Sequence, residues 1–138
     1  MIVYDTDFYQ PRKSPVTTQP LNMDILALLQ HLNPILSNAK AFLKALNELG
    51  MGTAGLTTAE DICNTEVTIF KDVVRLDALT RVKGLDFTKA WQKKVFLSLG
   101  DVMIPAINID DLIASKQAAG RPHDKDDIKI LEQAKRKK

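Results

Sequence analysis

The chain has 138 residues, of which 45% are hydrophobic and 26% charged, and its formal net charge is +2. This length suits one domain with one hydrophobic core, and no apolar run approaches the roughly 20 residues that a membrane-spanning helix needs. A membrane role is therefore not expected.

The N-terminus and the cysteine content bear on the cellular compartment. MIVYDTDFYQ carries two aspartates where a secretory signal has basic residues and then an apolar stretch. Cys63 is the only cysteine, which excludes an internal disulfide and agrees with a reducing compartment. The basic run at residues 135–138 lacks the interleaved aromatics or glycine-rich loop of a nucleic-acid site. We expect a cytoplasmic protein that does not bind nucleic acid.

Residues 1–22 differ in composition from the rest of the chain. MIVYDTDFY fits a short strand, whereas the following QPRKSPVTTQP contains three prolines and several polar residues, the composition of a loop or tail. We therefore divide the chain into residues 1–22, an N-terminal extension or a rearranged strand, and residues 23–138, a single domain.

Two helices are predicted at the start of this domain. The first spans residues 23–32, where apolar residues recur at helical spacing: Ile25, Leu28, Leu29 and Leu32. Asn22 fits its N-cap, and Pro34 ends it. The second helix is predicted from Ser37 to the glycine stop at Gly50.

Strands are predicted in the middle of the chain. Residues 57–60 (TTAE) resemble a capping box that opens a short helix. Residues 66–70 and 73–79 are rich in β-branched and apolar side chains, which favours strands. Because strand side chains alternate between faces, Arg75 and Asp77 are expected on the same face of the second strand.

The C-terminal third is predicted to contain a short helix, a hairpin and two helices. Residues 86–93 form the helix, with Phe87 and Trp91 facing inward, and VFLSLGDVMIPAI forms the hairpin about a Gly-Asp turn. Asp110 is expected to cap a helix that Gly120 ends, and a last helix begins near Asp124. Together the elements predict an α+β domain with a small mixed sheet and helices packed against it.

Three segments carry a resemblance to a known family. They are NAKAFLKALNELGMGTAGLTTAED, VVRLDALTRVKGLDFTKAW and IDDLIASKQAAGRPHDKDDIKIL, and together they cover most of the chain from Ser37 onward. In these segments the sequence resembles the bacterial minimal nucleotidyltransferase-like proteins, relatives of nucleotidyltransferase toxins within the DNA polymerase β-like superfamily. MDILALLQHLN also looks like the helix that opens those proteins.

The sequence departs from the family by an omission. The resemblance implies a segment with a Gly-Gly or Gly-Ser turn and an Asp-x-Asp strand after the opening helix, but here Leu32 is followed by NPIL and then directly by Ser37. The implied fold is a truncated nucleotidyltransferase-like fold. In the family the aspartates hold Mg²⁺ and the glycine turn cradles the phosphates of the nucleoside triphosphate. Asp77 stands where the third carboxylate is expected, and His123 where relatives commonly carry lysine.

Asp5 and Asp7 are the candidates to replace the missing pair. Residues two apart in a strand point to the same side and can share a metal ion, so a rearranged N-terminal strand beside Asp77 would restore a Mg²⁺ site. The alternative is that both aspartates belong to a solvated extension, because Asp-x-Asp occurs often by chance.

Lys116 and Arg121 are the candidate nucleotide-binding residues. A lysine on an apolar helix face can bury its stem and hold its ammonium in water, whereas the resemblance implies that Lys116 points toward the nucleotide phosphates. Arg121 has the same two alternatives, and we favour its pairing with Asp124 or Asp127. The acids at residues 124, 126 and 127 open a helix, where they suit capping.

Three hypotheses for the function follow. The preferred one is a degenerate nucleotidyltransferase-like domain, weak or inactive, that binds a partner protein. The second is an active Mg²⁺-dependent transferase that moves a nucleotide from ATP or another NTP to a protein or small acceptor, with Asp5, Asp7 and Asp77 as metal ligands and Lys116 at the phosphates. The third is a non-enzymatic interaction module in a toxin–antitoxin context. We also expect an exposed apolar patch where the missing strands would lie, covered by a partner protein or a homodimer.

Overall fold

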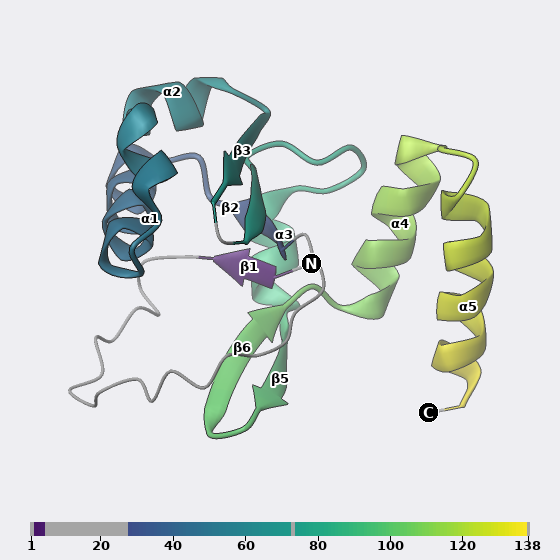
Figure 1. Cartoon of the computed structure of the whole chain (residues 1–138). Helices are drawn as coiled ribbons and strands as arrows, with labels where there is room; N and C mark the ends of the chain where they lie inside the picture. The colour runs from purple at the N-terminus through teal and green to yellow at the C-terminus, as the bar shows by residue number, and fades with distance from the viewer. Residues whose placement is uncertain (1, 5–27, 73, 138) are drawn as a thin grey trace.

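The structure is a computed structural model that describes residues 2–4, 28–72 and 74–137. It has the predicted α+β composition, with helices on both sides of a sheet and a helical pair beside it (Figure 1). In chain order the elements are β1 (Ile2–Tyr4), β2 (Leu28–Leu32), α1 (Leu36–Glu48), the 3-10 helix η2 (Gly52–Leu56), α2 (Ala59–Asn64), β3 (Val67–Lys71), β4 (Arg75–Leu79), α3 (Phe87–Gln92), β5 (Val95–Leu99), β6 (Val102–Ala106), α4 (Ile109–Ala119) and α5 (Asp124–Arg136).

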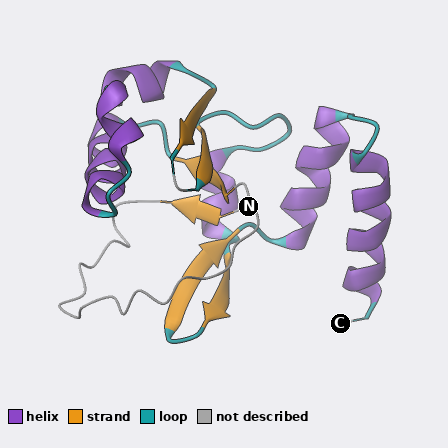
Figure 2. Ribbon diagram, in the orientation of Figure 1, coloured by secondary structure: helices purple, strands orange, loops and turns teal. Residues whose placement is uncertain are grey.

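The strands form one mixed sheet in the order β3-β4-β2-β1-β6-β5. Figure 2 shows the strands in orange. The three central strands β4, β2 and β1 run parallel to one another, and the remaining neighbours are antiparallel. A single residue pair, Ile2 with Ala106, joins β1 to β6. The β5–β6 hairpin is therefore attached to the rest of the sheet through one end of a three-residue strand.

The helix predicted over residues 23–32 is wrong where the structure describes it. Residues Leu28–Leu32 form β2, a central strand that pairs with β1 on one side and β4 on the other. Central parallel strands are covered on both faces and carry nearly continuous apolar runs, which a helical pattern matches equally well over so few residues. Residues 5–27, including the predicted cap Asn22, lie outside the described residues.

The hydrophobic core lies between one face of the sheet and the α1–α2 pair. Leu32, Phe70, Leu76 and Ala78 point to this face from three adjacent strands, and helix side chains including Phe42 and Ile62 meet them. The Phe42 and Phe70 rings meet edge to face, with centroids 6.0 Å apart. This core holds β3, β4 and β2 in position.

Two predicted helix starts are displaced along the chain. The capping box before α2 uses Thr58 and Asp61, one residue later than predicted: each side chain accepts a hydrogen bond from the other's backbone N–H. Helix α4 begins at Ile109, and its cap is Asn108, which accepts from the Asp111 N–H at 2.9 Å, whereas Asp110 was expected. Aspartate-rich starts offer several capping registers, and sequence alone does not choose among them.

The hairpin and the final helical pair are confirmed. β5 and β6 pair in register from Leu99–Val102 to Val95–Ala106 about the predicted Gly100-Asp101 turn. Gly120 has a left-handed φ of 63° and ends α4, and α5 follows from Asp124. Within the described ranges, every helix is too short or too polar to cross a lipid bilayer.

Candidate functional site

Asp77 and Arg75 lie together on the sheet face opposite the core. As the strand alternation predicts, both project from the same side of β4. Arg75 donates hydrogen bonds from Nε to Asp77 Oδ1 at 2.9 Å and from Nη2 to Asp77 Oδ2 at 3.0 Å. The hydrogen bond and charge of Asp77 raise the pKa of Arg75. Asp77 is 8% exposed, whereas the Arg75 side chain is exposed, so the pair lies at the protein surface with its carboxylate on the inner side.

The geometry around Asp77 bears on the predicted Mg²⁺ site. Within residues 2–4, 28–72 and 74–137, no group of three or more Asp, Glu, His or Cys side chains could hold a metal ion. Asp5 and Asp7 lie outside these residues, so their approach to Asp77 stays a prediction. The strand before them, β1, is separated from β4 by β2, which puts the β1 and β4 backbones roughly 10 Å apart at ordinary strand spacing.

Lys116 lies at the corner between α4 and α5. Its Nζ is 2.7 Å from Asp127 Oδ2 and 3.4 Å from Asp124 Oδ1, and the side chain is only 20% exposed. Two carboxylates from the first turn of α5 therefore bind its ammonium, a pairing that neither of the two alternatives for Lys116 included. The left-handed turn at Gly120 brings that first turn beside the last turn of α4.

Asp124 is the buried centre of this corner. It is 1% exposed and accepts hydrogen bonds from Arg121 N, Nε and Nη2 at 3.2, 2.8 and 3.1 Å, in addition to Lys116. The Arg121 side chain, against the opposing effect of burial, lowers the pKa of Asp124 to about 2. The favoured pairing of Arg121 with Asp124 is thus found. Asp124 organises the corner, whereas helix α5 has no side-chain cap at His123.

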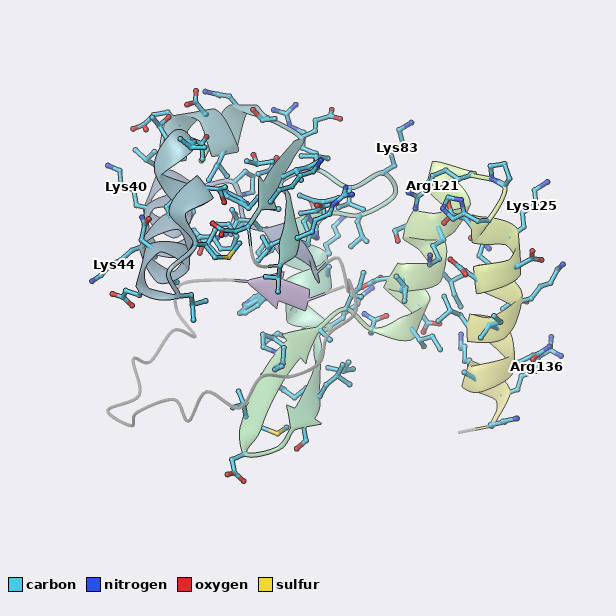
Figure 3. All side chains as sticks on the ribbon, in the orientation of Figure 1. Lys40, Lys44, Lys83, Arg121, Lys125 and Arg136 are labelled. Atoms are coloured by element: carbon cyan, nitrogen blue, oxygen red, sulfur yellow. The ribbon has the colours of Figure 1, made fainter. Side chains whose placement is uncertain are left out.

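A pocket of about 510 Å³ opens between this corner and the loop after β4. The loop contributes Arg81 and Lys83, and α4 and its end contribute Lys116 and Arg121, so four cationic side chains line it. Two of them, Lys83 and Arg121, are labelled in Figure 3. The remaining lining residues are apolar or neutral: Leu79, Val82, Leu112, Ser115 and Ala119. A more open hollow of about 600 Å³ on α1 and α2 contains charges of both signs and none of the predicted site residues.

Gly84 positions the loop against α4. Its φ is +74°, and a Cβ at this position would stand 2.6 Å from Ala118 Cβ and 3.0 Å from the Ala114 carbonyl oxygen. Only glycine allows so close an approach together with a left-handed backbone. The turn that contains it, with Leu85 N–H donating to Val82 O at 3.1 Å, therefore holds Arg81 and Lys83 across from α4.

The four cationic side chains of the pocket differ in how many ion pairs they form with carboxylates of the chain. Lys116 is held by two carboxylates, and Arg81 is 3.9 Å from Glu66 across an exposed surface. Lys83 makes no ion pair within the described residues, and Arg121 binds Asp124 through Nε and Nη2 alone. Lys83 and the Arg121 Nη1 group are thus the donors with most capacity for an added anion.

His31 lies on the same sheet face as Asp77, beneath α3. It is 1% exposed, its ring meets Phe87 edge to face at 5.1 Å, and its Nδ1 has no hydrogen-bond partner within the described residues. Burial lowers the pKa of His31, against an opposing effect of Asp86. Phe87 and Trp91 are half-buried as a stacked pair, so both face inward as predicted.

Arg81, Lys83 and Gly84 were not among the residues predicted for the site. A signal for them was present: they directly follow the C-terminal end of β4, the edge of a parallel sheet at which ligands commonly bind. Lys116 and Arg121 were found through the family resemblance alone, and the structure places them on this pocket.

Comparisons of the chain with protein-family models, with curated proteins and with solved structures returned no match. The resemblance to minimal nucleotidyltransferase-like proteins stays a prediction.

Proposed function

We propose that the chain is a degenerate nucleotidyltransferase-like domain that binds a phosphate-bearing ligand, such as a nucleoside triphosphate, and does not transfer it. The observation that carries this proposal is the pocket between the β4 loop and α4, whose lining contains four cationic side chains and no carboxylate. Clustered lysine and arginine side chains bind phosphate groups through charge-assisted hydrogen bonds.

The carboxylates behind the pocket support this role. Asp124 and Asp127 fix the Lys116 ammonium, and Asp124 also fixes the Arg121 guanidinium, so neither cation has to be ordered when an anion arrives. Preorganised donors bind with a smaller entropy cost. Because Arg121 lowers the pKa of Asp124 to about 2, this carboxylate is ionised at neutral pH.

The state of Asp77 argues against transfer. Both of its oxygens accept hydrogen bonds from Arg75, so a Mg²⁺ ion at Asp77 would have to share the carboxylate with a guanidinium cation and would gain a single protein ligand there. Phosphoryl and nucleotidyl transfer depend on metal ions held by several carboxylates. The competing proposal, an active Mg²⁺-dependent transferase, requires Asp5 and Asp7 to join Asp77.

Titration with ATP, with and without Mg²⁺, separates the two proposals. Binding by cationic side chains alone is expected to persist without Mg²⁺, to weaken with salt, and to be unchanged in Asp77→Asn. In an active transferase, Mg²⁺ would strengthen binding and Asp77→Asn would abolish both binding and label transfer to an acceptor.

A matched pair of lysine variants locates the binding site. Lys83→Ala is expected to weaken ATP binding about three- to tenfold, because it removes one exposed charge-assisted contact. Lys40→Ala, on the distant α1 surface, removes the same charge and is expected to have no effect (Figure 3). Equal effects of the two variants, or no binding of ATP by the wild-type chain, would contradict the proposal.

A further inference from the structure

The sheet ends in two edge strands of different character. At one end, β3 carries a charge within the strand, Lys71, and is flanked by Glu66 and Asp72; charges on an edge discourage pairing with another chain. At the other end, β5 is the uncharged and proline-free sequence VFLSL, flanked by Lys94 and Asp101. The two edges therefore differ within the strand itself, where β5 has no charged residue.

The β5–β6 hairpin also exposes apolar side chains on both of its faces. Val95, Leu97 and Val102 lie on one face and are 42%, 56% and 46% exposed, and Met103 on the other is 53% exposed. The hairpin extends away from both helical pairs (Figure 1). Exposed apolar surface beside an open strand edge is typical of an interaction site.

The two outer edges of the hairpin are not equivalent. Among the residues that the structure describes, β5 has no further strand partner and β6 pairs with β1 only at Ala106, but Pro105 lies on the β6 edge and has no N–H to donate. In an antiparallel pair, every second residue forms backbone hydrogen bonds with the neighbouring strand. Leu99 and Val102 flank the two-residue turn and form such a hydrogen-bonded pair. The next residue of β5, Ser98, therefore directs its backbone N–H and C=O away from β6. The edge suited to pairing is β5.

We propose that the protein forms a two-fold symmetric dimer in which β5 pairs antiparallel with β5 of a second copy, about an axis through Leu97. This register places Leu97, which is 56% exposed, opposite Leu97 of the second copy, so an apolar side chain meets its own copy at the axis. It also places Lys93 opposite Asp101 of the second copy at each end, so the charges that flank the strand are complementary. A strand that is complementary to itself in this way suits a closed dimer.

The oligomeric state of the full chain tests the proposal, measured by sedimentation over a range of concentrations. Because Leu97 meets Leu97 of the second copy at the axis, Leu97→Lys and Leu97→Glu are each expected to weaken dimerisation by about tenfold or more through like-charge repulsion. An equimolar mixture of the two variants is expected to recover the dimer, because lysine then meets glutamate. Recovery on mixing is specific to a residue on the symmetry axis.

Controls distinguish the β5 edge from general effects. Ile69→Lys places the same charge on β3, where the side chain is 47% exposed, and is expected to leave the dimer intact. Ser98→Pro removes an outward N–H and is expected to weaken the dimer, whereas Ser98→Ala is not; circular dichroism checks that each variant is folded. A wild-type chain that stays monomeric up to about 1 mM, or a dimer that survives both Leu97→Lys and Ser98→Pro, would overturn the proposal.

Discussion

The two faces of the sheet hold different kinds of residue. The face under α1 and α2 is lined by buried apolar side chains such as Leu32, Phe70 and Leu76. The opposite face holds the Arg75–Asp77 pair and the buried His31, and beyond Leu79 it leads to the cationic pocket. Burial of apolar side chains stabilises the fold without specifying a ligand or reaction. Charged and titratable groups are costly to bury and are often retained for function. Stability and ligand binding should therefore respond to different substitutions.

The largest expected effect is on the apolar face. Phe70 is 1% exposed, so Phe70→Ala removes a fully buried ring and is expected to lower the free energy of unfolding by about 3–5 kcal/mol. Urea denaturation measures this change. Leu56→Ala, at a position 83% exposed, is the control and is expected to stay within about 0.5 kcal/mol of the wild type. Equal effects of the two variants would show that the core is not where the structure places it.

An intermediate effect is expected where the loop meets α4. Gly84→Ala combines a left-handed backbone with a contact of 2.6 Å to Ala118 Cβ, and is expected to cost about 1–3 kcal/mol. Gly50→Ala shares the positive φ of +78° but meets nothing within 4 Å, so it isolates the backbone strain. Hydrogen exchange should show faster exchange in α4 for Gly84→Ala alone, together with weaker ATP binding. If both variants showed the same exchange in α4, the close packing of Gly84 against Ala118 would be contradicted.

The smallest effect concerns pH. Burial lowers the pKa of His31 in the folded protein below its ordinary value of 6.5, so the unfolded chain binds the extra proton first. The contribution of neutral His31 to stability is complete above pH 6.5 and is lost as the pH falls toward the folded pKa. Denaturation midpoints at several pH values measure this loss, and His31→Leu should remove it.

Sequence reasoning succeeded where local chemistry decides the structure. The Gly100-Asp101 turn defines the hairpin, Gly120 and Pro122 separate α4 from α5, and alternation along β4 places Arg75 beside Asp77. Each depends on residues close together in the chain, whose conformational preferences act directly.

It failed where distant contacts decide. Five residues ending in Leu32 become a strand because β1 and β4 supply hydrogen bonds on both sides, which no local pattern reveals. The pocket likewise depends on the loop after β4 meeting α4, some 30 residues later, and Gly84 is identifiable as a contact only once Ala114 and Ala118 are placed. The partners of Lys116 were also not predicted. Its ammonium was expected to meet water or phosphate, whereas it binds the carboxylates of α5.

The position of β1 in the sheet has a consequence for folding kinetics. Ile2 pairs with Gln30 on one side and with Ala106 on the other, and Ile2 and Ala106 are 104 residues apart along the chain. The β5–β6 hairpin and the α1–α2 core can form from neighbouring segments, but joining them requires closing a loop of about three quarters of the chain, and such non-local contacts slow folding. We expect refolding to show an early phase for the two parts and a later phase for their union through β1.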